Sequence, residues 1–309
     1  MRQGLLWLSE RQGIFNFVRR NGLARRFASR FVAGETVETG VAAAKALSRR
    51  GITASLDLLG ESVTAESEAA AARDLYLRML ERMAESGVEV NVSVKLTQMG
   101  LDIREDLCLA NMTAILERAK AIGGFVRLDM EGSDYTQRTL DFFSRHLFPP
   151  YGRHCGVVIQ SMLRRSAQDI EDLIAMGARV RLCKGAYLEP ADVAFPDKAD
   201  VDANYVRLME RLLRAGNYPG LATHDQAMIN RARELVKREG IVDERFEFQM
   251  LYGVRRDLQE RLRQEGHRLR VYIPFGTQWY PYLMRRLAER PANIAFMMGN
   301  IIRESMAGR

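Results

Sequence analysis

The sequence predicts an α/β protein in which a (β/α)₈ barrel over residues 51–309 follows a helical arm over residues 1–50. Two observations support this fold class. Short β-rich runs alternate with longer stretches of helical periodicity, which is the pattern of strands that pair in a parallel sheet. Eight such pairs follow one another, and a closed barrel of eight pairs takes roughly 250 residues. The chain has 309 residues, so it is long enough for one barrel with an extension.

The predicted strands are short and rich in β-branched and aromatic residues. They cover residues 53–59, 89–94, 125–130, 156–161, 179–183, 220–223, 246–251 and 269–273. The helical stretches between them cover residues 65–86, 107–121, 135–146, 167–176, 203–215, 228–239 and 258–264. Glycine or proline marks many junctions, as at Gly87, Gly177 and Pro219. An open doubly wound sheet is the alternative, but no G-x-G-x-x-G motif follows the first strand.

The composition narrows the class of protein and its compartment. The 46 basic and 39 acidic residues give a net charge of +7 that is spread along the chain. Nucleic-acid binding is therefore not expected, whereas an anionic substrate, cofactor or membrane surface fits this balance. Cys108, Cys155 and Cys183 are widely spaced and form no C-x-x-C motif, which predicts reduced cytoplasmic thiols and no metal site. We find no apolar run of ~18 residues and no signal-peptide core.

The arm contains two predicted helices, at residues 13–30 and 37–49. The first is basic and amphipathic, with phenylalanines on one face and arginines on the other. Such a helix can lie on an anionic membrane surface, which predicts peripheral membrane association through the arm. It can equally pack against the barrel as a cap, and the sequence leaves both interpretations open.

Polar side chains stand at the carboxyl ends of seven of the eight predicted strands, where barrels of this type carry their chemistry. They are Asp57, Glu61, Ser93, Lys95, Arg127, Asp129, Glu131, Gln160, Arg181, Lys184, Thr223, His224, Asp225 and Tyr272. A single buried charge of this kind is more often part of a core ion pair. The whole set predicts one active site, because charges inside a barrel must pair with each other or with a charged ligand.

Two further motifs concern ligands. Lys184-Gly185-Ala186 closes the fifth strand with a cation beside a small backbone, which allows close approach of a phosphate or an electron-rich ring. After the eighth strand, Tyr282, Arg285 and Arg286 share one side of a predicted helix. Paired guanidiniums beside an aromatic ring can hold a small carboxylate in a fixed orientation, although a solvated basic helix face has the same pattern.

Seven motifs together resemble a known family. They are V-K-L at 94–96, R-L-D-M-E at 127–131, V-I-Q at 158–160, V-R-L-C-K-G-A-Y at 180–187, A-T-H-D at 222–225, F-E-F-Q-M-L-Y-G at 246–253 and Y-L-M-R-R at 282–286. In this order they resemble the monofunctional bacterial proline dehydrogenases and the matching domain of the bifunctional proline utilization A proteins. The resemblance extends from about Thr53 to Ile301.

The resemblance implies a distorted (β/α)₈ barrel that holds FAD and oxidises L-proline to 1-pyrroline-5-carboxylate, the first step of proline catabolism. Hydride would pass to flavin N5 and the electrons to a membrane quinone, and a pyrroline-5-carboxylate dehydrogenase would act downstream. The protein would be cytoplasmic, on the inner face of the membrane where it is peripherally bound. Proline and hydroxyproline are not distinguished at this level.

The resemblance also implies residue roles. The substrate contacts would be Lys95, Leu251, Tyr272, Tyr282, Arg285 and Arg286. The flavin contacts would be Met130, Gln160, Arg181, Lys184, Gly185, Ala186, Thr223 and His224. Asp129 and Arg181 would be catalytic, and Glu61 would pair with Arg285 as a gate over the substrate. Leu188 departs from the family, some members of which have tryptophan there.

Elementary chemistry agrees with these roles. Hydride leaves the carbon beside nitrogen only while that nitrogen is neutral, so the site must favour the free amine. The surrounding cations would oppose the ammonium form and favour the carboxylate. Two alternatives remain from the residues alone: a Schiff-base lyase or aldolase that uses Lys95 or Lys184, and a basic module that binds nucleic acid or membranes.

Overall fold

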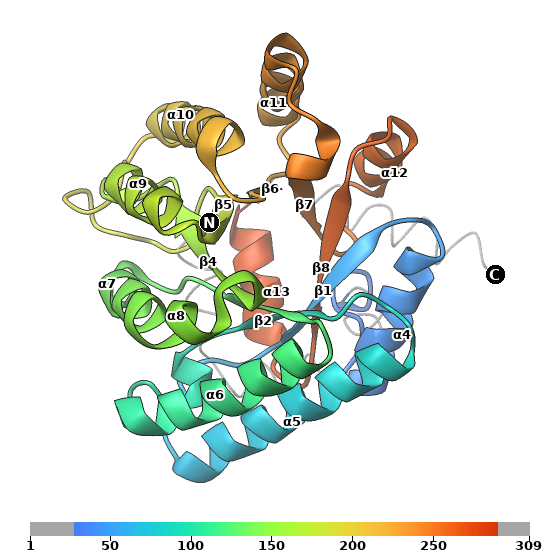
Figure 1. Ribbon diagram of the computed structural model, residues 1–309, viewed down its shortest axis with the longest axis vertical. Helices are drawn as coiled ribbons and strands as arrows, with labels where there is room; N and C mark the ends of the chain where they lie inside the picture. Colours follow the sequence, from blue (N-terminus) through green and yellow to red (C-terminus); the bar gives the residue numbers. More distant parts are fainter. Residues whose placement is uncertain (1–27, 290–309) are drawn as a thin grey trace.

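Eight parallel strands close into a barrel in chain order, and β8 pairs with β1 to complete it (Figure 1). The structure is a computed structural model that describes residues 28–289, of which residues 285–289 are described as backbone only. The strands are β1 (Thr53–Leu58), β2 (Asn91–Val94), β3 (Phe125–Leu128), β4 (Cys155–Gln160), β5 (Arg179–Cys183), β6 (Gly220–Ala222), β7 (Glu247–Leu251) and β8 (Leu269–Phe275). The predicted barrel is confirmed, with strand bounds that differ by at most two residues.

A ring of helices surrounds the barrel (Figure 1). Those that follow β1 to β7 are α5 (Glu66–Glu85), α6 (Glu105–Ala121), α7 (Ser133–Phe142), α8 (Phe148–Tyr151), α9 (Ser166–Met176), α10 (Lys198–Ala215), α11 (Gln226–Glu239) and α12 (Arg256–Gln264). A π-helical turn, Phe143–Leu147, joins α7 to α8. Helix α10 begins five residues before its predicted start, because its first turn is polar and carries no apolar periodicity.

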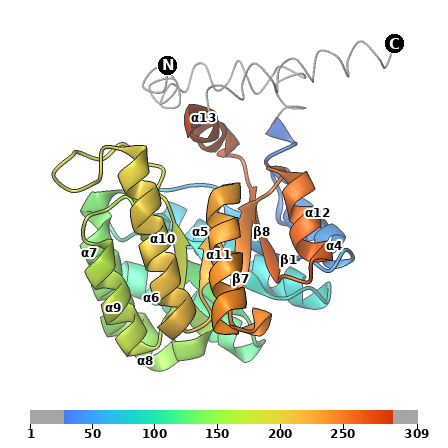
Figure 2. The same ribbon diagram turned by 90° about the horizontal axis from the view of Figure 1, so that it is seen from above.

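The last helix, α13 (Trp279–Glu289), does not join this ring but lies across the carboxyl ends of the strands (Figure 2). The chain turns toward it at Gly276, whose φ of 122° suits glycine. Helix α4 (Val37–Ser48), which precedes β1, takes the ring position between α5 and α12 and packs on β1 and β8 (Figure 1). A Cβ at Gly40 would lie 3.1 Å from the Phe275 ring, so glycine permits this packing. The barrel is therefore distorted, as expected.

Two apolar clusters hold these parts together. The larger one fills the space between the barrel and its helices, with Tyr76, Met79 and Met83 of α5 fully buried. The second joins the end of the arm to α13 and contains Ala28, Phe31, Val32, Leu59, Trp279, Tyr280, Tyr282, Leu283 and Met284. Backbone hydrogen bonds of 2.9 Å from Ala33 N–H to Pro274 O and from Gly276 N–H to Gly34 O fix the arm beside the end of β8.

Most of the predicted helix 13–30 lies outside the described residues, and so does its proposed membrane contact. Residues 28–32 of the arm do pack against α13, in agreement with the interpretation of the arm as a cap. The division into an arm of residues 1–50 and a barrel of residues 51–309 stays a prediction. In the part of the chain that the structure describes, every helix is too short or too polar to cross a bilayer.

Candidate active site

The predicted site residues of the barrel lie at or near the carboxyl ends of its strands, below helix α13 (Figure 2). In strand order they are Lys95, Asp129, Met130, Gln160, Arg181, Lys184, Gly185, Ala186, Thr223, His224, Leu251 and Tyr272. Glu61 lies in the loop between β1 and α5. This end of a parallel barrel is where loops from every strand converge, so the fold brings these separate segments to one place.

Arg181 is the centre of the site. Its Nη1 donates to Oδ1 of Asp129 at 2.6 Å, and its Nε donates to Oε1 of Gln249 at 2.6 Å. Nη1 and Nη2 each lie 3.2 Å from the hydroxyl oxygen of Ser93. A guanidinium has five N–H donors, and the second N–H of Nη2 has no acceptor among residues 28–284. The fixed plane of Arg181 therefore leaves one donor for a ligand.

Tyr272 completes this centre from β8. Its hydroxyl donates to Oδ2 of Asp129 at 2.8 Å, and the Arg181 guanidinium lies 5.3 Å from its ring centroid. Burial, together with the negative charges of Asp129 and Asp57, raises the pKa of Tyr272 well above 10. The phenol consequently stays protonated and keeps donating at physiological pH.

A second buried ion pair lies beside it. Lys95 Nζ donates to Oδ1 of Asp57 at 3.1 Å, and both side chains are buried. Burial by itself would lower the pKa of Lys95, but the charges of Asp57 and Asp129 outweigh burial and raise this pKa above its usual value. Lys95 is therefore a permanent cation at the mouth of the barrel.

Between β3 and β4 the site offers an unused polar atom. Gln160 donates through Nε2 to the backbone oxygen of Glu131 at 2.7 Å, which fixes the direction of its amide. Its Oε1 is buried and has no hydrogen-bond partner among residues 28–284. A buried acceptor without a donor is costly, so this atom is suited to a ligand that presents an N–H group.

The loop after β5 combines a cation with a constrained glycine. Lys184 forms ion pairs with Asp202 of α10 at 2.5 Å and with Asp225 at 2.9 Å. Gly185 has a φ of 107°, and a Cβ there would lie 2.3 Å from the sulfur of Met162. Any other residue at position 185 would strain this loop.

The loop after β6 is tied to the end of β7. The backbone N–H of Leu251 donates to Nε2 of His224 at 2.9 Å. Because Nε2 accepts this bond, the neutral His224 ring carries its proton on Nδ1. Thr223 is buried next to it, and its Oγ1 accepts from Asp225 N–H at 3.1 Å. The predicted flavin contacts Thr223 and His224 are thus rigidly placed.

Helix α13 covers this arrangement. Tyr282 is buried in the cluster that joins α13 to the arm. Arg285 and Arg286 lie on α13, but their side chains fall outside the described residues. The predicted carboxylate contacts of these two arginines, and the gate between Glu61 and Arg285, therefore stay predictions.

Gln249 and Asp202 contact predicted site residues but were not predicted themselves. Gln249 holds Arg181, and Asp202 holds Lys184. The alternation along β7 gave a usable signal for Gln249, because it faces the barrel interior with Glu247. Nothing local marks Asp202, which reaches the site from the first turns of α10.

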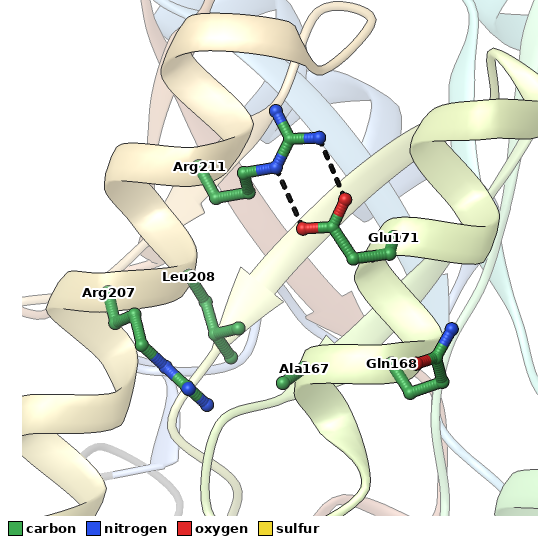
Figure 3. A pocket seen from close by; sticks show the side chains of 6 residues that line it. All are labelled: Ala167, Gln168, Glu171, Arg207, Leu208 and Arg211. Carbon is green, nitrogen blue, oxygen red and sulfur yellow. Dashed lines mark hydrogen bonds and ion pairs between the residues drawn. The ribbon is translucent and has the colours of Figure 1, made fainter.

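A cavity of about 230 Å³ lies elsewhere, between α9 and α10 (Figure 3). It is lined by Ala167, Gln168, Glu171, Arg207, Leu208 and Arg211. Its central charges are already paired, since Arg211 donates to both carboxylate oxygens of Glu171 at 2.7 Å. It contains none of the predicted site residues. The described residues also contain no group of three or more His, Cys, Asp or Glu side chains that could hold a metal ion.

A closed parallel barrel with paired charges at the carboxyl ends of its strands defines an enzyme of the (β/α)₈ class. The chain belongs to the proline dehydrogenase family, whose model, described as "Proline dehydrogenase", matches residues 41–298. This match begins before Thr53 and includes α4 from Val41 onward.

Individual proteins that resemble the chain support the same family. The chain is 43% identical to "Proline dehydrogenase" of Deinococcus radiodurans over 98% of both chains. It is 40% identical to "Proline dehydrogenase 1" of Bacillus subtilis over 98% of this chain and 100% of that one. Among solved structures, proline utilization A from Bdellovibrio bacteriovorus, inactivated by N-propargylglycine, superposes with a TM-score of 0.81 at 26% identity. That match covers 90% of this chain and 34% of the other.

Proposed function

We propose that the protein oxidises L-proline to 1-pyrroline-5-carboxylate by hydride transfer to N5 of a bound FAD, as the first step of proline catabolism. The observation that carries this proposal is the Arg181 guanidinium, which Asp129, Ser93 and Gln249 hold with one N–H to spare. A bound flavin would supply the hydride acceptor, and a preoriented cation such as Arg181 would stabilise the negative charge of its reduced form. Arg181 is therefore suited to stand beside N5.

The described residues fit FAD on two counts. The buried Oε1 of Gln160, which has no partner among residues 28–284, suits a ligand with a ring N–H, and the loop after β5 presents Lys184 next to the half-buried residues Gly185 and Ala186. FAD, when bound, supplies the hydride acceptor. We assign the flavin contacts to Met130, Gln160, Arg181, Lys184, Gly185, Ala186, Thr223 and His224.

The charge balance of the site supports the substrate assignment. The formal charges of Asp57, Lys95, Asp129 and Arg181 cancel. An anionic carboxylate therefore needs additional cations, and α13 supplies two in Arg285 and Arg286. We assign the proline carboxylate to these arginines with Lys95, and the pyrrolidine ring to Leu251, Tyr272 and Tyr282. Cations around the ring nitrogen favour the free amine that hydride transfer requires.

Asp129 is assigned a catalytic role through Arg181, because it accepts hydrogen bonds from both Arg181 and Tyr272. Glu61 and Arg285 are assigned to a gate over the substrate, and a movement of α13 would open and close this gate.

A membrane quinone is the proposed electron acceptor. The protein would be cytoplasmic and would reach the quinone by peripheral association with the membrane through its basic arm. A pyrroline-5-carboxylate dehydrogenase would consume the product.

The absorbance spectrum of purified protein, recorded before and after anaerobic addition of L-proline, tests this function. We expect flavin bands that bleach on addition of proline. Protein that carries no flavin after reconstitution, or flavin that proline leaves oxidised, would overturn the proposal. Hydroxyproline in a parallel cuvette compares the two candidate substrates.

The lyase alternative makes the opposite demand on Lys95. A Schiff-base lysine must lose its proton to attack a carbonyl. Burial by itself would lower the pKa of Lys95, but the charges of Asp57 and Asp129 outweigh burial and raise this pKa, so Lys95 stays an ammonium. Trapping of a substrate adduct with borohydride would support the lyase over the oxidoreductase.

A further inference from the structure

A continuous line of hydrogen-bonded side chains crosses the interior of the barrel, from the site at its carboxyl end to its amino end. It links Asp129, Arg181, Gln249, Glu247 and Arg270 in this order. All five side chains are buried. The proposed function assigns roles to Asp129 and Arg181 but none to Gln249, Glu247 and Arg270.

Gln249 joins the two halves of this line. Its Oε1 accepts from Arg181 Nε at 2.6 Å, and its Nε2 donates to Oε1 of Glu247 at 2.6 Å. The chemistry of the neighbours determines this direction. Arg181 can only donate and an ionised Glu247 can only accept, so the amide has one orientation that satisfies both.

Arg270 keeps Glu247 ionised. Its Nε donates to Oε1 of Glu247 at 2.7 Å and its Nη2 to Oε2 at 3.1 Å, while Nη1 donates to the backbone oxygen of Ala54 at 3.0 Å. Burial by itself would raise the pKa of Glu247, but the charge and hydrogen bonds of Arg270 outweigh it and lower this pKa below its usual value. Glu247 is consequently a fixed acceptor for the Gln249 amide.

The backbone of β6 makes room for this contact. Gly220 pairs in register with Arg181 on one side and with Glu247 on the other, so it lies under the bridge that Gln249 forms. A Cβ at position 220 would lie 2.4 Å from Nε2 of Gln249. The absence of a side chain at Gly220 thus permits the one conformation in which Gln249 reaches both partners.

We infer that Gln249 is a positioning residue for Arg181, and that Glu247, held by Arg270, sets the direction in which Gln249 acts. Asp129 and Ser93 fix the Nη side of the guanidinium, whereas Gln249 fixes the Nε side. Contacts on both sides determine where the remaining Nη2 N–H points. The inference rests on the proposed function, in which this donor faces the flavin.

The test replaces Gln249 with methionine, which has a similar shape but cannot make either bond. We expect the rate constant of flavin reduction by proline to fall by about tenfold to a hundredfold, the cost of a slightly misplaced group. The midpoint potential of the bound flavin should fall as well, because the cation that stabilises the reduced form is less well directed. The dissociation constant of FAD should stay within about threefold, since Gln249 acts through Arg181.

Asn111→Leu is the matched structural control. Asn111 is a buried amide that also accepts from an arginine, Arg73, and donates to a backbone oxygen, but it lies on α6 outside the barrel. Its replacement should lower the melting temperature and leave the flavin potential unchanged. In the Arg181→Met background, Gln249→Met should cause no further loss in the rate of flavin reduction.

The outcomes distinguish a failure of the positioning role of Gln249 from a failure of the proposed function. If Gln249→Met lowers the melting temperature as Asn111→Leu does, with unchanged potential and reduction rate, Gln249 is structural and the inference is overturned. If the wild type binds flavin that proline does not reduce, the proposed function fails. The inference is then decided by the midpoint potential of the bound flavin, measured with a redox dye in the wild type and in Gln249→Met. If the wild type binds no flavin, both fail.

Discussion

Tyr272 and Asp129, which are contributed by β8 and by the loop after β3, are joined by a hydrogen bond of 2.8 Å in which the phenol is the donor. The other carboxylate oxygen of Asp129 accepts from Arg181. One buried carboxylate thus connects the aromatic wall of the proposed substrate site with the cation assigned to the flavin.

Tyr272→Phe should lower the free energy of unfolding by about 1–3 kcal/mol, because it leaves a buried acceptor of Asp129 without its donor. Tyr205→Phe is the control, since the buried Tyr205 hydroxyl has no hydrogen-bond partner in the described part of the chain. Removing that hydroxyl should be neutral or stabilising. Urea denaturation of both variants measures the difference, and equal losses would contradict the importance of the Tyr272–Asp129 bond.

Lys95→Met should destabilise the protein by about 3–5 kcal/mol at neutral pH, because it leaves the buried Asp57 carboxylate without a partner. Lys95→Met combined with Asp57→Asn should recover much of this loss. Denaturation of the two variants at the same pH checks the expectation, and a double variant as unstable as Lys95→Met would argue against a buried ion pair.

The cost of Lys95→Met should also depend on pH. Burial raises the pKa of the Asp57 carboxyl and Lys95 opposes this rise, so the pKa rises further without the lysine. A carboxyl with a raised folded-state pKa favours the folded state below that pKa, and this contribution is lost as the pH rises through it. The gap between wild type and variant should therefore narrow as the pH is lowered toward the ordinary value of 3.8.

Gly185→Ala should be more destabilising than Gly177→Ala, although both glycines have positive φ angles, of 107° and 76°. Alanine at position 177 meets nothing within 4 Å, so its cost is backbone strain alone, about 1 kcal/mol. Alanine at position 185 must also displace Met162. Thermal unfolding compares the two, and Gly185→Ala should in addition weaken FAD binding, measured by flavin fluorescence. Equal melting temperatures would show that Met162 moves away from the new Cβ without loss of stability.

Arg286→Met should raise the Michaelis constant for proline by roughly a hundredfold or more, because a charged hydrogen bond to the carboxylate is lost, while FAD stays bound. Arg238→Met on the exposed surface of α11 serves as the control and should leave the constant unchanged. Steady-state kinetics with an artificial electron acceptor supply the measurement. An unaltered Michaelis constant in Arg286→Met would remove Arg286 from the carboxylate site.

The barrel could be predicted from the sequence because its elements depend on local periodicity. The strand-end residues could be predicted too, since parallel strands present their carboxyl ends at one face. Contacts between residues that are far apart in the sequence could not be predicted. Lys184 forms an ion pair with Asp202 of α10, and Gln249 reaches Arg181 only because Gly220 lies between them. Likewise, no local pattern shows that α4 replaces the last helix in the ring.

The position of α4 and α13 has a consequence for folding. The ring is completed by a segment that precedes β1, and the cover of the site is held by Ala28, Phe31 and Val32 against residues that follow β8. These contacts join the most distant parts of the described chain, and contacts of large sequence separation form late because closing a long loop costs entropy. The site would thus acquire its cover only after the rest of the barrel has formed, so a nascent chain would remain without a closed site until α13 has been synthesised.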